Sequence, residues 1–310
     1  MHHLFIINPL AGKGKAYKKL IEDIKKYCNE NSIDYEIILT QAPNHATKLA
    51  AEYSEKYKDK GIKIYAAGGD GTLNEAAKGI LSLKDHSHVA LGIFPIGNGN
   101  DFARNISSKQ ALNIEAQINA ASLTIDVMKV CVNSLEIFGL NAVTVGWDSE
   151  IAIDVHNKRN RRLSSGTMAY VSSLLKGLGR IHRTYPLKIT LDDKKITGNY
   201  FITMTGNGSF YGGGFKAAPL AKLDDGLLDV VMVTKVPYLK LPSLLINYAT
   251  GKHMDENKKD MFKNYLTYSF VKKITIESTE LLPITVDGEG QYSNKLTIEV
   301  IKKDLNFLIP

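Results

Sequence analysis

Hydrophobic and polar positions in the first third of the chain alternate between two periods. Short apolar runs, typical of buried strands, are followed by stretches in which apolar residues such as Leu20, Ile21 and Ile24 recur with helical spacing. Strands are expected over 3–7, 35–39, 62–67 and 89–94, and helices over 16–29, 46–57 and 73–83. The alternation predicts a parallel sheet covered by helices on both faces.

The pattern changes near residue 122, where β-rich runs become dominant. Two pairs of runs are joined by the short polar turns Asn133-Ser134 and Asp192-Asp193. Expected strands cover 123–132, 135–145, 187–191, 196–205, 227–234, 274–277, 284–286 and 296–300, with helices over 167–178 and 241–250. The fold class is therefore α/β plus β, with an α/β domain over 1–124 and an antiparallel β domain over 125–310. The last residues could pack back on the first domain.

Composition and charge narrow the possible environments. The chain has 310 residues, 44% of them apolar, which is enough for a full core. No apolar run approaches the ~18 residues of a bilayer span, and the first ten residues lack the features of a secretion signal. Cys28 and Cys131 are too few for a disulfide framework or a cysteine-based zinc site. We expect a cytoplasmic protein.

The net charge of +7 favours polyanionic partners. Nucleotide phosphates, nucleic acid and an anionic membrane all fit, and so does a solvated basic surface. No nucleic-acid partner is expected, because no basic stretch interleaved with aromatic residues is present.

The most specific motif is AAGGDGTLNE over 66–75, between an expected strand and an expected helix. Its glycines allow backbone amides to approach a phosphate closely, and the start of the helix favours an anion. Asp70 cannot bind phosphate directly, but it could hold a Mg²⁺ ion that lies between them. The alternative is a glycine-rich connection in which Asp70 caps the helix.

Two further turns follow buried strands. PIGNGNDFAR over 95–104 again combines glycines, small amide side chains and a carboxylate, Asp101. NPLAGKGK over 8–15 has some character of a P-loop, but the spacing of that motif is absent. Its lysines could attract phosphates or simply be solvated.

These turns, in this order, resemble the diacylglycerol kinase catalytic domain family, and the resemblance runs over nearly the whole chain. Residues 68–75 match the family's GGDGT(x)NE signature completely, whereas Asn98 stands where a threonine is usual in the family's turn over 95–104. The resemblance implies a Rossmann-like nucleotide-binding domain of the NAD kinase and phosphofructokinase type, followed by a β-sandwich domain for the lipid substrate. The nucleotide-binding residues that it implies are Asn8, Pro9, Gly12, Lys13, Thr40, Gly68, Gly69, Asp70, Gly71, Thr72, Leu73, Asn74, Glu75, Gly97 and Asn98.

The resemblance also implies metal and catalytic residues. Asp70 and Asp101 would anchor the Mg²⁺ of the nucleotide. A structural Mg²⁺ in the second domain would be held by the Asp225 carboxylate and the carbonyls of Lys222 and Leu227, in a segment that could also be a plain Asp-Gly turn. The DGE segment over 287–289, which taken alone is more typical of a hairpin turn, would supply the base, with Glu289 the first choice and Asp287 the second.

The implied function is an ATP- and Mg²⁺-dependent lipid kinase that converts diacylglycerol to phosphatidic acid. The alternatives are a phosphotransferase similar to NAD kinase and a non-catalytic lipid- or nucleotide-binding regulator. A segment of NAD kinase that contains asparagine and glutamate has no full counterpart at 140–143. The resemblance further implies peripheral contact with a membrane that carries the substrate, and dimers through the β domain would fit.

Three segments bear on the lipid. The basic cluster over 158–162, with Arg180 and Arg183, could dock on an anionic membrane or be a solvated helix end. The apolar stretches over 163–178 and 237–250 could line an acyl groove or belong to the core.

Overall fold

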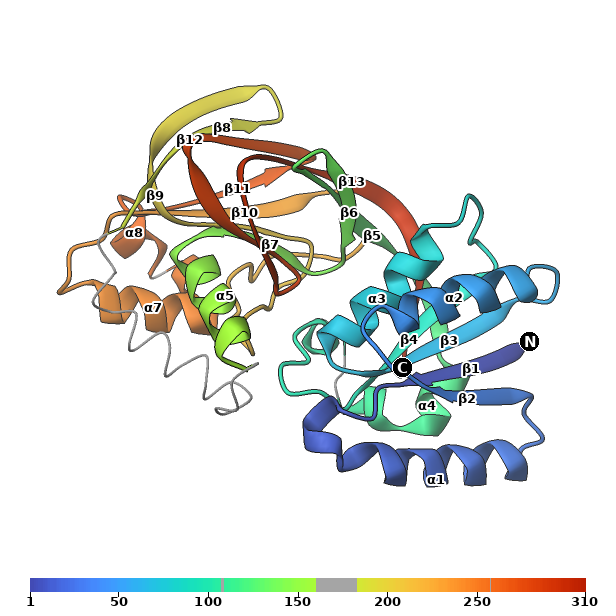
Figure 1. Cartoon of the computed structure of the whole chain (residues 1–310). Coiled ribbons are helices and arrows are strands. Elements are labelled where there is room, and N and C mark those ends of the chain that lie inside the picture. The colour runs from blue at the N-terminus through green and yellow to red at the C-terminus, as the bar shows by residue number, and fades with distance from the viewer. Residues whose placement is uncertain (107–108, 160–182, 257) are drawn as a thin grey trace. The chain divides into compact units, whose positions relative to one another are not determined.

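A computed structural model of the chain describes residues 1–106, 109–159, 183–256 and 258–310. The chain forms two compact units (Figure 1). Unit 1 comprises Met1–Ile125 and Lys303–Pro310, and unit 2 comprises Asp126–Lys302. The expected helix over 167–178, most of the basic cluster and the apolar stretch over 163–178 lie outside the described residues.

Unit 1 contains four parallel strands in the order β4-β3-β1-β2. Their bounds are β1 His2–Ile7, β2 Tyr35–Leu39, β3 Ile62–Gly68 and β4 Val89–Pro95. Apolar side chains on these strands are buried because helices cover both faces, with α1 on one face and α2 and α3 on the other (Figure 1). All carboxyl ends of the parallel strands therefore meet at one edge, where the glycine-rich turns begin.

The helices of unit 1 are α1 Ala16–Glu30, α2 His45–Lys56, α3 Asp70–Leu81 and α4 Ile114–Asn119, with 3₁₀ turns η1 Ala11–Gly14, η2 Phe102–Arg104 and η3 Gln110–Leu112. Helix α1 buries Leu20, Ile24 and Cys28, which lie four residues apart on one face. All seven elements expected over this part are present, and their ends differ by at most three residues. The largest difference is the start of α3, expected at residue 73. The helix begins at Asp70 because Gly69, in extended backbone, serves as its N-cap.

The end of the chain returns to unit 1. Strand β13, Glu289–Ile309, pairs in parallel with β4 through Phe307 and Leu91. The side chains of Leu305, Phe307 and Leu308 are fully buried.

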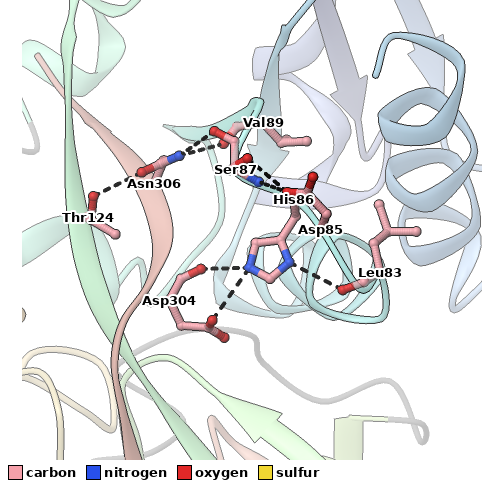
Figure 2. Close-up of polar contacts among 8 residues, drawn as sticks. All are labelled: Leu83, Asp85, His86, Ser87, Val89, Thr124, Asp304 and Asn306. Carbon is pink, nitrogen blue, oxygen red and sulfur yellow. Dashed lines mark hydrogen bonds and ion pairs between the residues drawn. The ribbon is translucent and has the colours of Figure 1, made fainter. Parts of the chain in front are cut away.

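Polar contacts hold this returning segment in place, as Figure 2 shows. The His86 ring lies between two carbonyl oxygens, with Nε2 2.7 Å from that of Asp304 and Nδ1 3.3 Å from that of Leu83. The Asn306 amide donates to the carbonyl of Ser87 at 2.9 Å and accepts from the Thr124 hydroxyl at 2.9 Å. Residues 303–310 are thus an integral part of the first unit.

Unit 2 is built from antiparallel strands in the order β11-β10-β9-β7-β12-β13, with β8 pairing β9 and β12, and β5 pairing β6. The bounds are β5 Ala121–Val132, β6 Leu135–Gly139, β7 Ala142–Gly146, β8 Tyr185–Leu191, β9 Lys194–Gly206, β10 Leu228–Thr234, β11 Leu266–Val271 and β12 Lys273–Val286. Its helices are α5 Trp147–Arg159, α7 Leu241–Thr250 and α8 Lys259–Phe262, with the 3₁₀ turn η5 Lys252–Met254. No helix among the described residues is long and apolar enough to cross a membrane.

The strands of unit 2 differ from expectation in four places. The expected strand over 135–145 is divided into β6 and β7 at Leu140-Asn141, whose amides bind the Asp287 carboxylate. The expected strands over 274–277 and 284–286 are one strand, β12, whose pairing with β13 shifts register between Glu277 and Leu282. Strand β13, expected only over 296–300, extends over Glu289–Ile309, and strand β11 was not expected. Helices α5 and α8 were not expected either.

Candidate active site

The two glycine-rich turns of unit 1 touch each other through their backbones. The Gly97 amide donates to the Gly68 carbonyl at 2.9 Å. A Cβ atom on Gly97 would lie 2.3 Å from the Cα of Gly69, which is closer than any side chain tolerates. Position 97 requires glycine because the main chain at Gly69 occupies the space that a side chain would fill. The turns over 68–75 and 95–104 therefore form one continuous surface.

Two carboxylates converge on this surface. Asp70 lies in the first turn of α3, and its Oδ1 accepts from the Phe102 amide at 3.0 Å. The position of a Cβ on Gly99 is 3.1 Å from Asp70 Oδ2 and 3.8 Å from Asp101 Oδ2. Asp101 is buried, and its Oδ1 lies 3.6 Å from Nε of Arg104. Both acids are thus held in fixed positions around one point.

The first turn joins the same surface. The Asn8 side chain donates to the Thr72 hydroxyl at 3.2 Å and accepts from the Leu10 amide at 3.0 Å. Gly12 has a φ of 56°, and a Cβ there would lie 2.3 Å from the carbonyl oxygen of Ile96. Three turns that are far apart in sequence are therefore in direct contact at the carboxyl ends of β1, β3 and β4.

The surface also has open and unsatisfied positions. Among the described residues, no atom lies within 4 Å of the position of a Cβ on Gly71. Asn74 is only 3% exposed, and neither its side-chain oxygen nor its nitrogen has a hydrogen-bond partner in the described part of the chain. The first N–H groups of a helix have no partners within the helix, so the start of α3 offers donors to an anion here.

The other sequence-predicted nucleotide residues differ in what their side chains do. Leu73 is buried in the core, and the Glu75 carboxylate accepts from the Ala46 amide at 3.3 Å, in the first turn of α2. Thr40 follows β2, and its amide donates to the Ile7 carbonyl at 2.8 Å. Pro9 and Asn98 are half-buried within their turns, whereas the Lys13 side chain lies outside the described part of the structure.

In unit 2, the DGE segment forms the hairpin turn between β12 and β13. Asp287 and Gly288 have φ values of 47° and 87°, and Val286 pairs with Glu289 across the turn. The Asp287 carboxylate accepts from the amides of Leu140 at 2.7 Å, Asn141 at 3.0 Å and Ala142 at 2.9 Å. Glu289, by contrast, is exposed. The two acids therefore differ in their surroundings, because the Asp287 carboxylate binds backbone amides and Glu289 is an exposed residue.

The predicted metal segment in unit 2 forms a tight turn. Asp225 Oδ1 accepts from the Leu227 amide at 3.0 Å, and Gly226 donates at 2.6 Å to the fully buried Asp126. Burial and the nearby Asp225 charge raise the pKa of Asp229 to about 6. Within the described ranges, no group of three or more His, Cys, Asp or Glu side chains could hold a metal ion. A cation here would therefore depend on backbone carbonyls, such as those of Lys222 and Leu227, for part of its coordination.

Sequence reasoning missed one buried acid, Asp148, at the start of α5. Its side chain is 2% exposed, and its Oδ2 accepts from the Tyr211 hydroxyl at 3.0 Å. Burial raises the pKa of Asp148 to about 7. The sequence signal was weak, since Asp148 belongs to none of the motifs identified in the sequence.

Two family models match the chain. Residues 2–130 match the diacylglycerol kinase catalytic domain, and residues 141–309 match the YegS C-terminal NAD kinase beta sandwich-like domain. "Putative lipid kinase YtlR" of Bacillus subtilis (strain 168) is 30% identical over 301 residues, 93% of each chain. A diacylglycerol kinase of the same strain is 26% identical, over 92% of this chain and 88% of the relative.

Solved structures agree at the level of the fold. A crystal structure of a diacylglycerol kinase from Bacillus anthracis str. Sterne covers 100% of this chain and 97% of its own, with a TM-score of 0.71 at 23% identity. This chain belongs to the lipid kinase family that carries the diacylglycerol kinase catalytic domain.

Proposed function

We propose that this protein uses ATP and Mg²⁺ to phosphorylate a lipid hydroxyl, with diacylglycerol as the first acceptor to test and phosphatidic acid as the product. The observation that carries the proposal is the contact between Gly69 and Gly97, which joins two phosphate-type turns around Asp70 and Asp101. Phosphoryl transfer depends on alignment and charge neutralisation, and this surface has groups for both.

Unit 1 fits a nucleotide in the manner of a Rossmann-like domain. The amides at the start of α3 would hold the phosphates, since no atom of the described residues blocks the approach at Gly71. The buried amide of Asn74 would gain a partner that the described residues do not supply. Asn8 would position Thr72 through their hydrogen bond.

The two carboxylates fit Mg²⁺. This ion prefers one or two carboxylates together with water and phosphate oxygens over an all-protein cage. Asp70 and Asp101 would hold it from one side, and the bound ion would neutralise charge on the transferred phosphoryl group. A second, structural Mg²⁺ would lie against Asp225 and the carbonyls of Lys222 and Leu227, where it would offset the repulsion between Asp225 and Asp229.

Glu289 is the base that we assign to the lipid hydroxyl. It is exposed on a rigid hairpin, so its carboxylate can accept a proton from a bound alcohol. Asp287 is the weaker choice, because three backbone amides already occupy its oxygens. We assign to Asp287 the role of holding the hairpin that presents Glu289.

The experiment measures transfer of label from γ-labelled ATP to lipid by the purified chain. Asp70→Ala and Glu289→Gln should each lower kcat by at least ~10²-fold, the scale of a lost positioning or acid–base group. Glu136→Gln is the matched control, because Glu136 is an exposed glutamate that pairs only at the surface with Lys129. Urea unfolding of each variant tests whether the fold is kept. Turnover at the wild-type rate in either site variant refutes the assignment of that residue.

The acceptor is identified by a panel of lipids offered side by side. Diacylglycerol, a monoacylglycerol, a sphingoid base and a prenol-like alcohol are compared with NAD⁺ at equal ATP and Mg²⁺. Phosphorylation of NAD⁺ alone would favour the rival phosphotransferase, and no transfer to any acceptor would favour a non-catalytic regulator. A lipid acceptor would support a cytoplasmic enzyme in peripheral contact with a membrane.

A further inference from the structure

An exposed apolar ridge lies on unit 2 at the start of α7 (Figure 1). Leu239 is 97% exposed, Ile246 is 64% exposed and Tyr238 is 57% exposed. Large apolar side chains this exposed are ordinary when scattered, but these three belong to one segment of nine residues. We call residues 237–246 the α7 ridge.

The spacing within the α7 ridge places its apolar side chains on one face. Leu239, Pro242 and Ile246 recur three and four residues apart, and all three are exposed. The turn that contains Leu239 continues into the helix, since the Leu241 amide donates to the Pro237 carbonyl at 3.2 Å and the Leu244 amide to that of Lys240 at 2.9 Å. The exposed apolar face is therefore formed by the turn over 237–240 together with the solvent-facing side of α7.

The opposite face of α7 is fixed to the core. Leu241, Leu244 and Tyr248 are buried in a cluster with Trp147 and Phe201. The turn that contains Leu239 is thus attached to a helix whose opposite face is buried in the core. The exposure of Leu239 is therefore not that of a residue in a loose loop. Transfer of an exposed leucine side chain from water into an apolar environment is favourable, so burying Leu239 in a partner would lower the free energy.

The charged residues at the start of the α7 ridge are lysines. Lys235 and Lys240 are exposed on either side of the turn, and Lys240 Nζ lies 5.2 Å from the centre of the Tyr265 ring. The nearest acidic residues in sequence are Asp229 and Asp255, which lie beyond the two ends of this segment. An apolar face edged by lysines is the pattern of a helix that lies in the interface of an anionic membrane.

We propose that the α7 ridge inserts Leu239, and with it Ile246, into the headgroup region of an anionic bilayer. This rests on the proposed function, because a kinase for a long-chain lipid must reach an acceptor that stays in the membrane. The lysines contact anionic headgroups while the apolar side chains enter the boundary of the acyl chains. The membrane is favoured over a second copy of the chain because two copies would bring their lysines together.

The test measures binding of the full chain to vesicles by co-sedimentation, separately from kinase activity. Vesicles of phosphatidylcholine alone are compared with vesicles that contain phosphatidylglycerol, from low to high salt. Leu239→Asp should lower the partition coefficient by ~10-fold or more, the scale expected for losing one buried leucine. Lys235→Gln should weaken binding to the anionic vesicles only, and by less as salt rises. Leu135→Asp is the matched control. Leu135 is 63% exposed on β6, so this variant makes the same leucine-to-aspartate change at an exposed position elsewhere on unit 2.

Kinase assays separate this inference from the proposed function. Leu239→Asp should retain wild-type turnover on a short-chain diacylglycerol in detergent micelles and lose it on vesicles. If the wild-type protein binds vesicles but phosphorylates no lipid, the proposed function is refuted and the inference of a membrane-binding surface is still supported. Equal vesicle binding by Leu239→Asp and wild type overturns the inference. So does a sedimentation measurement in which Leu239→Asp only dissociates an oligomer.

Discussion

Replacing Gly97 by alanine tests whether the two glycine-rich turns work as one surface. The new Cβ would lie 2.3 Å from the Cα of Gly69 and 2.8 Å from its nitrogen, and both of these are backbone atoms that no rotamer change can remove. Ordinary contact begins near 3.4 Å, so the turns must separate by roughly 1 Å. Overpacking of this kind typically costs about 1–3 kcal/mol of stability. A displacement of about 1 Å at a phosphoryl-transfer site can lower kcat/KM by ~10²-fold.

Gly71→Ala is the informative partner of this variant. Its Cβ would lie more than 4 Å from every atom of the residues that the structure describes, and Gly71 lies inside α3, where alanine favours the helix over glycine by about 0.5–1 kcal/mol. We expect a protein at least as stable as the wild type, but with a KM for ATP raised ~10-fold, because the methyl group occupies the path of the phosphate. Gly97→Ala should therefore lower the stability and Gly71→Ala should keep or raise it, whereas both variants should use ATP less well than the wild type.

The assays are urea unfolding without nucleotide, and steady-state kinetics with ATP varied at saturating lipid. Gly97→Ala with wild-type stability and turnover would refute the contact between the turns. Gly71→Ala with an unchanged KM for ATP would refute the placement of a phosphate at the start of α3. Both outcomes can be read without knowing the natural acceptor, provided that one lipid of the panel is turned over.

Further predictions concern single side chains. Because burial raises the pKa of Asp148 to about 7, the unfolded chain ionises this carboxyl at lower pH than the folded protein does. The free energy of unfolding of the wild type should therefore fall by about 2–4 kcal/mol relative to that of Asp148→Asn as the pH rises from about 4 to about 7. A difference between the two proteins that stays constant over this pH range, measured by urea unfolding, would contradict this. Asp287→Ala removes the acceptor of three backbone amides and should cost about 2–4 kcal/mol of stability, whereas Glu289→Gln should leave urea unfolding unchanged. Glu75→Ala should cost about 1 kcal/mol, because the first turn of α2 loses an acceptor, with thermal unfolding as the measurement.

The elements of unit 1 could be predicted because each signal is local. Apolar periodicity located the strands and helices, and glycines marked the turns at the strand ends. Unit 2 was harder because its interruptions depend on distant residues. The break between β6 and β7 exists because Asp287, some 146 residues later in sequence, binds the amides of Leu140 and Asn141. Strand β11 was missed because its Thr267 and Ser269 dilute the apolar pattern, as is usual for a strand at a sheet edge.

The site was predictable as a set of turns but not as a set of roles. The GGDGT motif correctly marked a place where turns meet, because such glycines are needed only where backbones approach closely. Sequence could not show that Glu75 faces α2, that Leu73 is buried, or that Asp287 holds three amides. Those contacts join residues far apart in the chain, and no local spacing reports them.

Because residues 303–310 return to the first unit, this unit can complete its fold only after the end of the chain has been synthesised. A nascent chain emerging from the ribosome will have produced all of β1 to β4 long before Leu305, Phe307 and Leu308 exist to cover β4. The first unit must therefore wait, with part of its core open, while the 177 residues from Asp126 to Lys302 are translated. Proteolytic trimming beyond residue 302 would damage the first unit rather than the second, which directly precedes the cut.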